Sequence, residues 1–568
     1  MPQIAFNRYY KHQELSQLLH DFAAEYPNLL QLQSIGKSHE GKDIWMITAT
    51  NLQTGPAEDK PAFWCDGNIH ASEVSASTAV LHLLNKLVTQ YGTDEKITRL
   101  LDSRAFYLVP RLNPDGAEWA LEDIPRIVRS GTRPYPYDEE DIAGLDKQDI
   151  DGDGRILNMR IKDPNGPWKI SETHPRLMEK RKPGEEGGTY YRVLPEGLLH
   201  NFDGITLRWH HKPQGLDFNR NFPSGWRPEA EQYGAGPYPT SEPEIRAAVQ
   251  TITDRPNITG AITFHTYSGV FLRPPSRKPD EDIPAEDLWL YKEFGETCQQ
   301  LTGYPAISNY HEFRYHPKEV ITGVFDDWMY EHRGVFAWTC EIWAPPRQAG
   351  ITDYKYIEWF REHPFEHDIK MLEWSDKELD GKGYIDWYKF DHPQLGEVEI
   401  GGWDAMASFR NPPLKFLEKE IAPLGDFAIY QLAASPKLEK RALEIIPLGD
   451  GTHKVRLAVA NTGYLPTNVS AHAKSAKLCR GVVAEISKQG DTHKSAGSPA
   501  PSWLISGKLR EEAGQLSGWS HVSKGGWGWQ LDETSDIAVF EWILAGSGTY
   551  DLVVKHERAG TVRESVQL

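Results

Sequence analysis

Residues 67 to 76, GNIHASEVSA, place an imidazole and a carboxylate three positions apart, at His70 and Glu73. The pair comes just after an apolar run, where small residues leave room around both side chains. A catalytic zinc ion is usually held by about three nitrogen or oxygen ligands, with one position left open for water. Because the pair alone is also typical of an ordinary polar helix start, a metal centre requires a third ligand from another segment.

His265 is the best candidate for that third ligand. It ends the apolar run GAITFH, so it lies at the same kind of strand end as His70. Other histidines fit less well: two lie in a polar region, and the two of HEFRYH are five positions apart, where a shared helix face needs four; these are His210, His211, His311 and His316.

The elements that must position these residues alternate between strands and helices, which predicts an α/β fold with helices on both faces of a sheet. In such folds, ligands gather beyond the carboxyl ends of the strands. The predicted elements are a hairpin over 29–50, strands within 61–70, 103–116, 257–265 and 335–343, and helices over 12–25, 75–91, 285–303, 322–334 and 356–375.

The pattern of polar and apolar residues changes after about residue 378. Segments such as THKVRLAVANTG and TYDLVVKHE alternate polar and apolar residues between glycine-rich turns, which predicts a small all-β sandwich. We therefore predict a catalytic domain over 1–378, a linker or wrapping segment over 379–430 and an accessory domain over 431–568. A polar stretch over 130–215 is predicted to be an insertion near the cleft.

Composition narrows the function classes. The formal net charge of −19 over 568 residues argues against nucleic acid and anionic membranes as partners. No apolar run is long enough to suggest a membrane span. Four cysteines are too few for a disulfide framework, and the first residues do not resemble a secretion signal. The sequence thus predicts a cytoplasmic protein, with a trimmed secreted form as the alternative; it says nothing of the oligomeric state.

Seven short motifs occur in an order that resembles the zinc carboxypeptidase family, the group of carboxypeptidases A and B. They are HASE, NPDG, RIVRS, GLDFNRNF, FHTYSG, DDWMYEHRG and FAWTCEIW, and the similarity spans about residues 8 to 378. The resemblance implies a mixed, mostly parallel sheet with helices on both faces, followed here by the β-sandwich. It implies one Zn²⁺ per chain, bound by His70, Glu73 and His265, with Glu341 as the general base.

The same resemblance implies roles for several other side chains. Arg129 matches the arginine that polarises the scissile carbonyl, although Arg126 and Arg133 are close rivals in sequence. Asn219 and Arg220 match the pair that grips the terminal carboxylate of the substrate, since a planar guanidinium suits a carboxylate.

The pocket residues of the family are harder to match. Counting back from Trp328 without gaps puts Glu319 where the family has its mobile tyrosine, so Tyr315 is our candidate, with Tyr310 as the alternative. Tyr267 is a further substrate-binding candidate. Asp326 falls at the floor of the specificity pocket, which predicts a preference for terminal Lys or Arg; a helix-capping role is the alternative.

The insertion contains DIDGDGRI, in which Asp149, Asp151 and Asp153 alternate before a glycine. Carboxylates in this pattern can converge on Ca²⁺, but the twelfth position is Arg160, so a helix-loop-helix calcium site is incomplete. A calcium site and a solvated acidic turn are equally open interpretations.

The leading hypothesis is a zinc metallocarboxypeptidase that acts on peptides with a free C-terminal carboxylate. One alternative keeps the fold but acts on cell-wall peptides or side-chain amides, and an acyl-amino-acid deacylase is a further variant. An alternative of another class is an inactive binding or scaffold protein on a peptidase fold.

Overall fold

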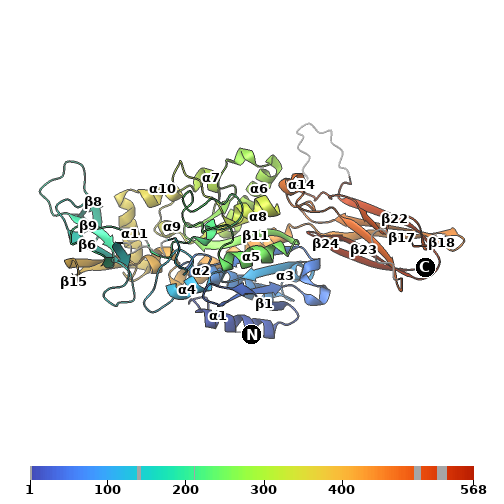
Figure 1. Ribbon diagram of the computed structural model, residues 1–568, viewed down its shortest axis with the longest axis horizontal. Helices are drawn as coiled ribbons and strands as arrows, with labels where there is room; N and C mark the ends of the chain where they lie inside the picture. The colour runs from blue at the N-terminus through green and yellow to red at the C-terminus, as the bar shows by residue number, and fades with distance from the viewer. Residues whose placement is uncertain (1–2, 137–142, 210–211, 492–500, 521–533) are drawn as a thin grey trace.

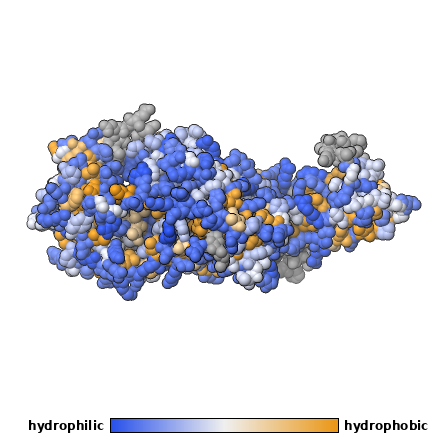
Figure 2. Space-filling model, turned by 90° about the horizontal axis from the view of Figure 1, so that it is seen from below, coloured by the Kyte–Doolittle hydropathy of each residue, from blue (hydrophilic) through white to orange (hydrophobic). Residues whose placement is uncertain are grey.

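The protein is elongated and has three parts (Figure 1), as shown by a computed structural model that describes residues 3–136, 143–209, 212–491, 501–520 and 534–568. A central α/β unit lies between a small inserted sheet at one end and a β-sandwich at the other. On the face shown in Figure 2, hydrophilic residues predominate and hydrophobic ones form scattered groups. No helix within the described ranges is long and apolar enough to cross a bilayer, and the location of the protein stays a prediction.

The central sheet has eight strands in the order β1-β2-β4-β3-β11-β14-β12-β13. Four of its seven neighbouring pairs are parallel, including β3–β11 and β11–β14, so the predicted mixed, mostly parallel sheet is confirmed. β3 and β11 are buried along their whole length, which explains their unbroken apolar runs. The bounds are β1 Leu30–Lys37, β2 Asp43–Ala49, β3 Ala62–Gly67, β4 Ala105–Val109, β11 Ile258–Thr266, β12 Val270–Arg273, β13 Ala306–Ser308 and β14 Phe336–Ile342.

Helices cover both faces of this sheet, as predicted (Figure 1). α2 packs against β3 and β11 with an almost wholly buried surface, and α8 packs against β11 and β14. The helices of this unit are α1 His12–Glu25, α2 Val74–Gln90, α3 Glu95–Ser103, α4 Pro114–Ala120, α5 Pro243–Thr253, α6 Ala285–Thr302, α7 Asn309–Glu312, α8 Phe325–Arg333, α9 Pro345–Gln348, α10 Tyr356–Arg361 and α11 Phe365–Glu378.

Two local predictions were wrong. The single helix expected over 356–375 is divided into α10 and α11, because Pro364 lacks an N–H group and disfavours helical geometry at His363. The strand predicted within 103–116 was expected to end in a turn at NPDG, but a helix begins there: Asn113 accepts a hydrogen bond from the N–H of Gly116, and Pro114 begins α4.

The inserted sheet joins two distant parts of the chain. Its order is β15-β16-β6-β9-β7-β8, so β16, from the predicted linker, pairs with β6, from the insertion. Further along the same linker, α12 and α13 pack on α2 and join the main core. The division into domains remains a prediction. The predicted linker contributes β16 to the inserted sheet and α12 and α13 to the main core. The bounds are β5 Gly144–Lys147, β6 Asn158–Lys162, β7 Trp168–Ile170, β8 Met178–Lys180, β9 Tyr191–Pro195, β10 Gly197–His200, β15 Tyr384–His392, β16 Gly396–Trp403, α12 Leu414–Ile421 and α13 Leu424–Ala433.

The C-terminal part is the predicted all-β sandwich, built from two four-stranded sheets, β17-β18-β22-β20 and β21-β19-β23-β24. Their inward side chains form a separate apolar core. Arg558 and Ser470 donate hydrogen bonds to carbonyl oxygens at the end of α8, which attaches the sandwich to the central unit. The bounds are β17 Leu438–Gly449, β18 Thr452–Asn461, α14 Ala471–Ser475, β19 Val483–Lys488, β20 Leu504–Ser506, β21 Arg510–Glu512, β22 Ile537–Ala545, β23 Thr549–His556 and β24 Gly560–Gln567.

Candidate metal centre and active site

His70 and Glu73 lie in the short loop that joins β3 to α2. The loop turns sharply at Asn68, which has a positive φ of 60°. The side-chain amide of Asn68 donates hydrogen bonds to the carbonyl oxygens of His70 and Ala71, at 2.7 and 3.2 Å. The loop is therefore held by its own hydrogen bonds, with both functional side chains buried.

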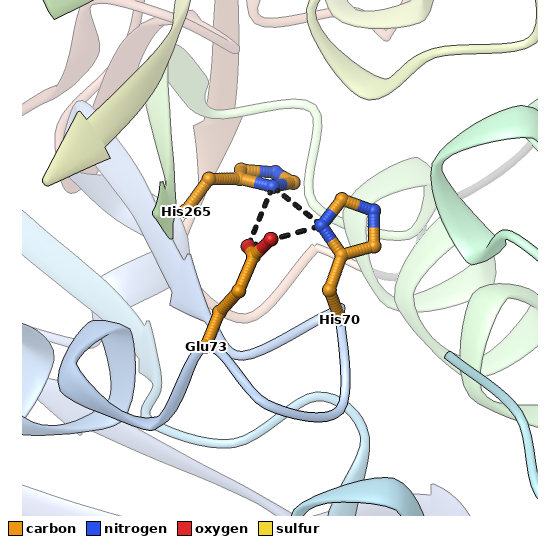
Figure 3. Close-up of side chains that lie close together, drawn as sticks. All are labelled: His70, Glu73 and His265. Carbon is orange, nitrogen blue, oxygen red and sulfur yellow. Dashed lines mark hydrogen bonds and ion pairs between the residues drawn. The ribbon is translucent and has the colours of Figure 1, made fainter. Parts of the chain in front are cut away.

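His265 reaches the same place from the neighbouring strand. Since β3 and β11 run parallel, with Gly67 paired to Phe264, the ends of both strands meet at one edge of the sheet. The three side chains point toward one another (Figure 3). Nδ1 of His70 lies 3.0 Å from Oε2 of Glu73 and 3.0 Å from Nδ1 of His265, and the latter nitrogen lies 3.2 Å from the same Oε2.

These three atoms fit a zinc ion. Ligands at about 2.0–2.1 Å from a tetrahedral zinc ion are about 3.3 Å from one another, close to the spacing found here. Two imidazole nitrogens that face each other and one carboxylate oxygen are a donor set for a cation. Burial lowers the pKa of His265 to about 4, so its ring is neutral at pH 7, as a metal ligand must be.

The second nitrogen of each imidazole is also held. Nε2 of His70 lies 3.1 Å from Oδ1 of Asp217. Nε2 of His265 lies 3.4 Å from the hydroxyl of Thr263, which donates a 2.6 Å hydrogen bond to Asp66. Such outer partners fix the orientation of a metal-binding imidazole.

Sequence reasoning missed Asp217, although it is two positions before Asn219 in GLDFNRNF. Besides His70, it accepts a 2.9 Å hydrogen bond from Nε of Arg129. Burial alone would raise its pKa, but the charges of Arg129 and Arg220 hold the pKa of Asp217 well below its usual range. Asp217 therefore stays ionised and links the metal centre to both arginines.

Glu341 lies beside the metal centre at the end of β14, directly paired with His265 in the sheet register. Burial, together with the negative charge of Glu73, raises the pKa of the Glu341 carboxyl well above its usual range. A carboxylate with a raised pKa is a better proton acceptor, which is the property expected of a general base.

Of the three arginines that compete in the sequence, only Arg129 is found at the metal centre among the described contacts. Its Nη1 lies 3.2 Å from Oε1 of Glu73, and its side chain remains 37% exposed, so a substrate can reach it. Arg126 pairs with Glu122, and Arg133 pairs with Glu242. His210 and His211 lie outside the described residues.

Asn219 and Arg220 lie in a single helical turn over Phe218–Arg220, facing the start of α8. Oδ1 of Asn219 accepts a 2.9 Å hydrogen bond from the N–H of Phe325, which orients its amide. Nη1 of Arg220 donates a 2.6 Å hydrogen bond to the backbone carbonyl of Asn219. Both side chains are buried close to Asp217, so the structure brings them to the neighbourhood of the metal centre.

The three pocket candidates have different surroundings. Tyr315 is 47% exposed, and the charges of Arg129 and Arg220 act on its hydroxyl. Tyr267 follows the ligand strand, and the guanidinium of Arg410 lies 5.2 Å from its ring centre. Asp326 is buried at the start of α8, where it accepts a 2.7 Å hydrogen bond from Asn309, and burial raises its pKa to about 6.

Arg410 is a second residue that sequence reasoning missed. It ends the single helical turn Met406–Arg410, in the predicted linker, yet its Nη1 lies 3.6 Å from Oε1 of Glu73. No motif marks it, because the residue comes close to the metal centre only through the packing of the linker.

The acidic loop of the insertion brings Asp149, Asp151 and Asp153 within 4.8 Å of one another. Their oxygens accept hydrogen bonds from backbone N–H groups of the same loop, and Asp151 also accepts one from Tyr388. This geometry suits a solvated acidic turn as well as a calcium loop, so the calcium site stays a prediction.

Two models of known protein families match parts of this chain. A family model described as zinc carboxypeptidase matches residues 15–360, which is more than half of the chain. The chain belongs to the zinc carboxypeptidase family. A second model, described only as a domain of unknown function, matches residues 437–567, the β-sandwich.

Individual zinc carboxypeptidases are distant relatives. The zinc carboxypeptidase of Saccharothrix mutabilis subsp. capreolus is 34% identical over 118 residues, which cover 20% of this chain and 26% of that protein. Carboxypeptidase A2 of Rattus norvegicus is 23% identical over 342 residues, 57% of this chain and 60% of the relative. The chain thus spans less than two thirds of the length of either relative. The crystal structure of carboxypeptidase A from Helicoverpa armigera aligns with a TM-score of 0.39 and 16% identity, covering 66% of this chain and 76% of that one.

Proposed function

We propose that the protein is a zinc-dependent carboxypeptidase that hydrolyses the last peptide bond of peptides with a free C-terminal carboxylate. The observation that carries this proposal is the meeting of His70, Glu73 and His265 at one sheet edge, with Glu341 paired to His265 in the register. Membership of the zinc carboxypeptidase family supports it.

When bound, a zinc ion lowers the pKa of a coordinated water to about 7 and polarises a carbonyl group. Glu341 would accept the proton of the attacking water and deliver it to the leaving amine, and a raised pKa makes its carboxylate a better proton acceptor. Arg129 would donate hydrogen bonds to the oxyanion that develops on the scissile carbonyl, from a guanidinium that Asp217 already holds in place.

Recognition of the substrate terminus falls to Asn219 and Arg220. A buried guanidinium that faces a carboxylate forms a strong, oriented pair, and this would restrict cleavage to chain ends. The exposed Tyr315 would close over the terminal residue, a role supported by its proximity to the charges of Arg129 and Arg220.

A preference for terminal Lys or Arg is the finer part of the proposal. Asp326 would select the cationic side chain, since it is buried and its raised pKa would fall when a cation arrives. Cleavage of peptides that end in Arg or in Leu, by the wild type and by Asp326→Asn, tests this preference. Equal rates for both peptides in the wild type would rule out the preference for terminal Lys or Arg without contradicting the peptidase activity.

The proposed activity is tested with one peptide in two forms, with a free and with an amidated C-terminus, followed by mass spectrometry. We expect loss of single residues from the free end, little from the amidated form, and no cleavage after chelation until Zn²⁺ is restored. Internal cleavage, equal cleavage of both forms, or activity that survives chelation would contradict the proposal. Adding Ca²⁺ to the chelated enzyme tests whether a second ion contributes.

A further inference from the structure

A cavity of about 290 Å³ opens beside Arg129, and its wall is rich in cations. Four positively charged side chains line it: Arg129, Lys147, Lys212 and Arg410. This concentration is unusual in a chain with a formal net charge of −19. The rings of Trp209 and Tyr233 supply apolar surface between the charges.

The cations come from segments far apart in the chain. Lys147 and Lys212 belong to the insertion, whereas Arg410 belongs to the predicted linker after the family match. Four like charges brought together by independent segments repel one another, and nearby carboxylates or a bound anion offset that repulsion.

The positive charge of this wall is only partly neutralised. Arg129 pairs with Asp217 and shares Glu73 with Arg410, and Nζ of Lys212 lies 3.5 Å from Oδ1 of Asp146. The ammonium of Lys147 lies 5.2 Å from the ring centre of Trp209, and among the described residues no carboxylate lies within ion-pair distance of it.

The position of the cavity relative to the proposed reaction indicates what would occupy it. Arg129, which would contact the scissile carbonyl, lines the cavity, but Asn219 and Arg220, which would hold the terminal carboxylate, do not. Ser72, between the two ligands of the HASE motif, also lines it. A bound peptide would therefore run from Arg220, past Arg129, into the cavity with the residues that precede the cleaved bond.

We propose that this cavity is a subsite for acidic side chains that precede the cleaved bond, so that the preferred substrates are peptides with Glu or Asp one or two positions before the terminal residue. Lys147 and Lys212 are the residues that determine this specificity. The inference rests on the proposed carboxypeptidase activity, and it adds the substrate class.

The test compares N-acetylated tetrapeptides that differ only by Glu or Gln, first one and then two positions before the terminal residue. At one of these positions we expect kcat/KM for the Glu peptide to exceed that for the Gln peptide about tenfold, the size expected of a charge-assisted contact. The ratio should shrink as ionic strength rises, because the contact is partly exposed.

Lys147→Gln and Lys212→Gln should each lower the Glu-to-Gln ratio to about threefold. Lys382→Gln, at an exposed lysine away from the cavity, is the matched control and should leave both rates unchanged. A ratio near one at both positions in the wild type, or a high ratio that neither lysine variant lowers, would overturn the subsite and leave the carboxypeptidase activity intact. Failure to cleave any of these peptides, with Zn²⁺ bound, would instead contradict the proposed function itself.

Discussion

The end of the central sheet and the core of the β-sandwich bury different kinds of side chain. In the sandwich, alternating strands bury apolar side chains such as Val455, Leu457 and Phe540 between two sheets. At the end of the central sheet, buried positions hold ionisable groups instead, among them His70, Glu73 and Asp217. Burial of charge costs stability unless partners compensate, so a region that accepts this cost is expected to carry the chemistry.

The compensation in the central unit is specific. Glu73 faces the imidazoles of His70 and His265 and two arginines, and Asp217 faces His70 and Arg129. Within the described part of the sandwich, no group of histidine, cysteine or carboxylate side chains converges as the metal centre does. Substitutions in the two regions should therefore separate activity from stability.

Glu341→Gln gives the largest expected effect. Removal of a general base typically costs about 10²–10⁴-fold, so we expect kcat to fall about 10³-fold. Because Glu341 is not one of the three ligands, zinc content and the melting temperature should stay close to those of the wild type. Activity within a few fold of the wild type would show that another group accepts the proton.

Arg220→Gln should lower kcat/KM for a free-carboxylate peptide about 100-fold, mostly through KM, because the buried partner of the substrate terminus is lost. Arg126→Gln is the matched control, since that arginine is exposed and pairs with Glu122. Steady-state kinetics measure kcat/KM and KM for both variants. An equal loss of kcat/KM in the two variants would show that Arg220 does not recognise the terminal carboxylate.

Asp217→Asn should weaken zinc affinity about tenfold, because His70 loses a charged partner on Nε2. Asp66→Asn should have a smaller effect, since Asp66 reaches His265 only through Thr263. Competition with a chromophoric chelator measures both affinities. A larger loss of zinc affinity in Asp66→Asn than in Asp217→Asn would contradict this prediction.

How much of this arrangement the sequence predicts depends on how local each signal is. His70 and Glu73 follow one buried strand and His265 lies at the end of another, so position and residue type make them candidates, and the family motifs support the choice. Short strands of three to five residues, such as β7 and β8, leave too little alternation to be recognised within 130–215. Lys147 and Arg410 carry no local signal at all, because only tertiary packing brings them to the cavity.

The smallest effect on activity is expected in the sandwich, at His556. Burial lowers the pKa of His556 to about 3 from 6.5, and its Nδ1 accepts a 3.0 Å hydrogen bond from the N–H of Arg558. Because the folded-state pKa is the lower one, the stability that this group contributes is fully present above pH 6.5 and is lost as the pH falls toward 3.

For a single proton, the loss in the free energy of unfolding is at most about 1.4 kcal/mol per pH unit. His556→Gln should flatten this dependence for the sandwich while kcat/KM at pH 7 stays unchanged. Hydrogen exchange of β23 between pH 7 and pH 4.5 measures the pH dependence of the stability of the sandwich in the full chain. An unchanged acid dependence in the variant would assign the loss to other groups.

Zinc binding at His70, Glu73 and His265 is tested most directly by the anomalous scattering of a crystal grown with Zn²⁺, measured on both sides of the zinc absorption edge. We expect one strong zinc peak per chain, about 2.0–2.1 Å from Nδ1 of His70, Nδ1 of His265 and a carboxylate oxygen of Glu73. A fully formed protein with no peak there, or with its zinc bound at other residues, would contradict it.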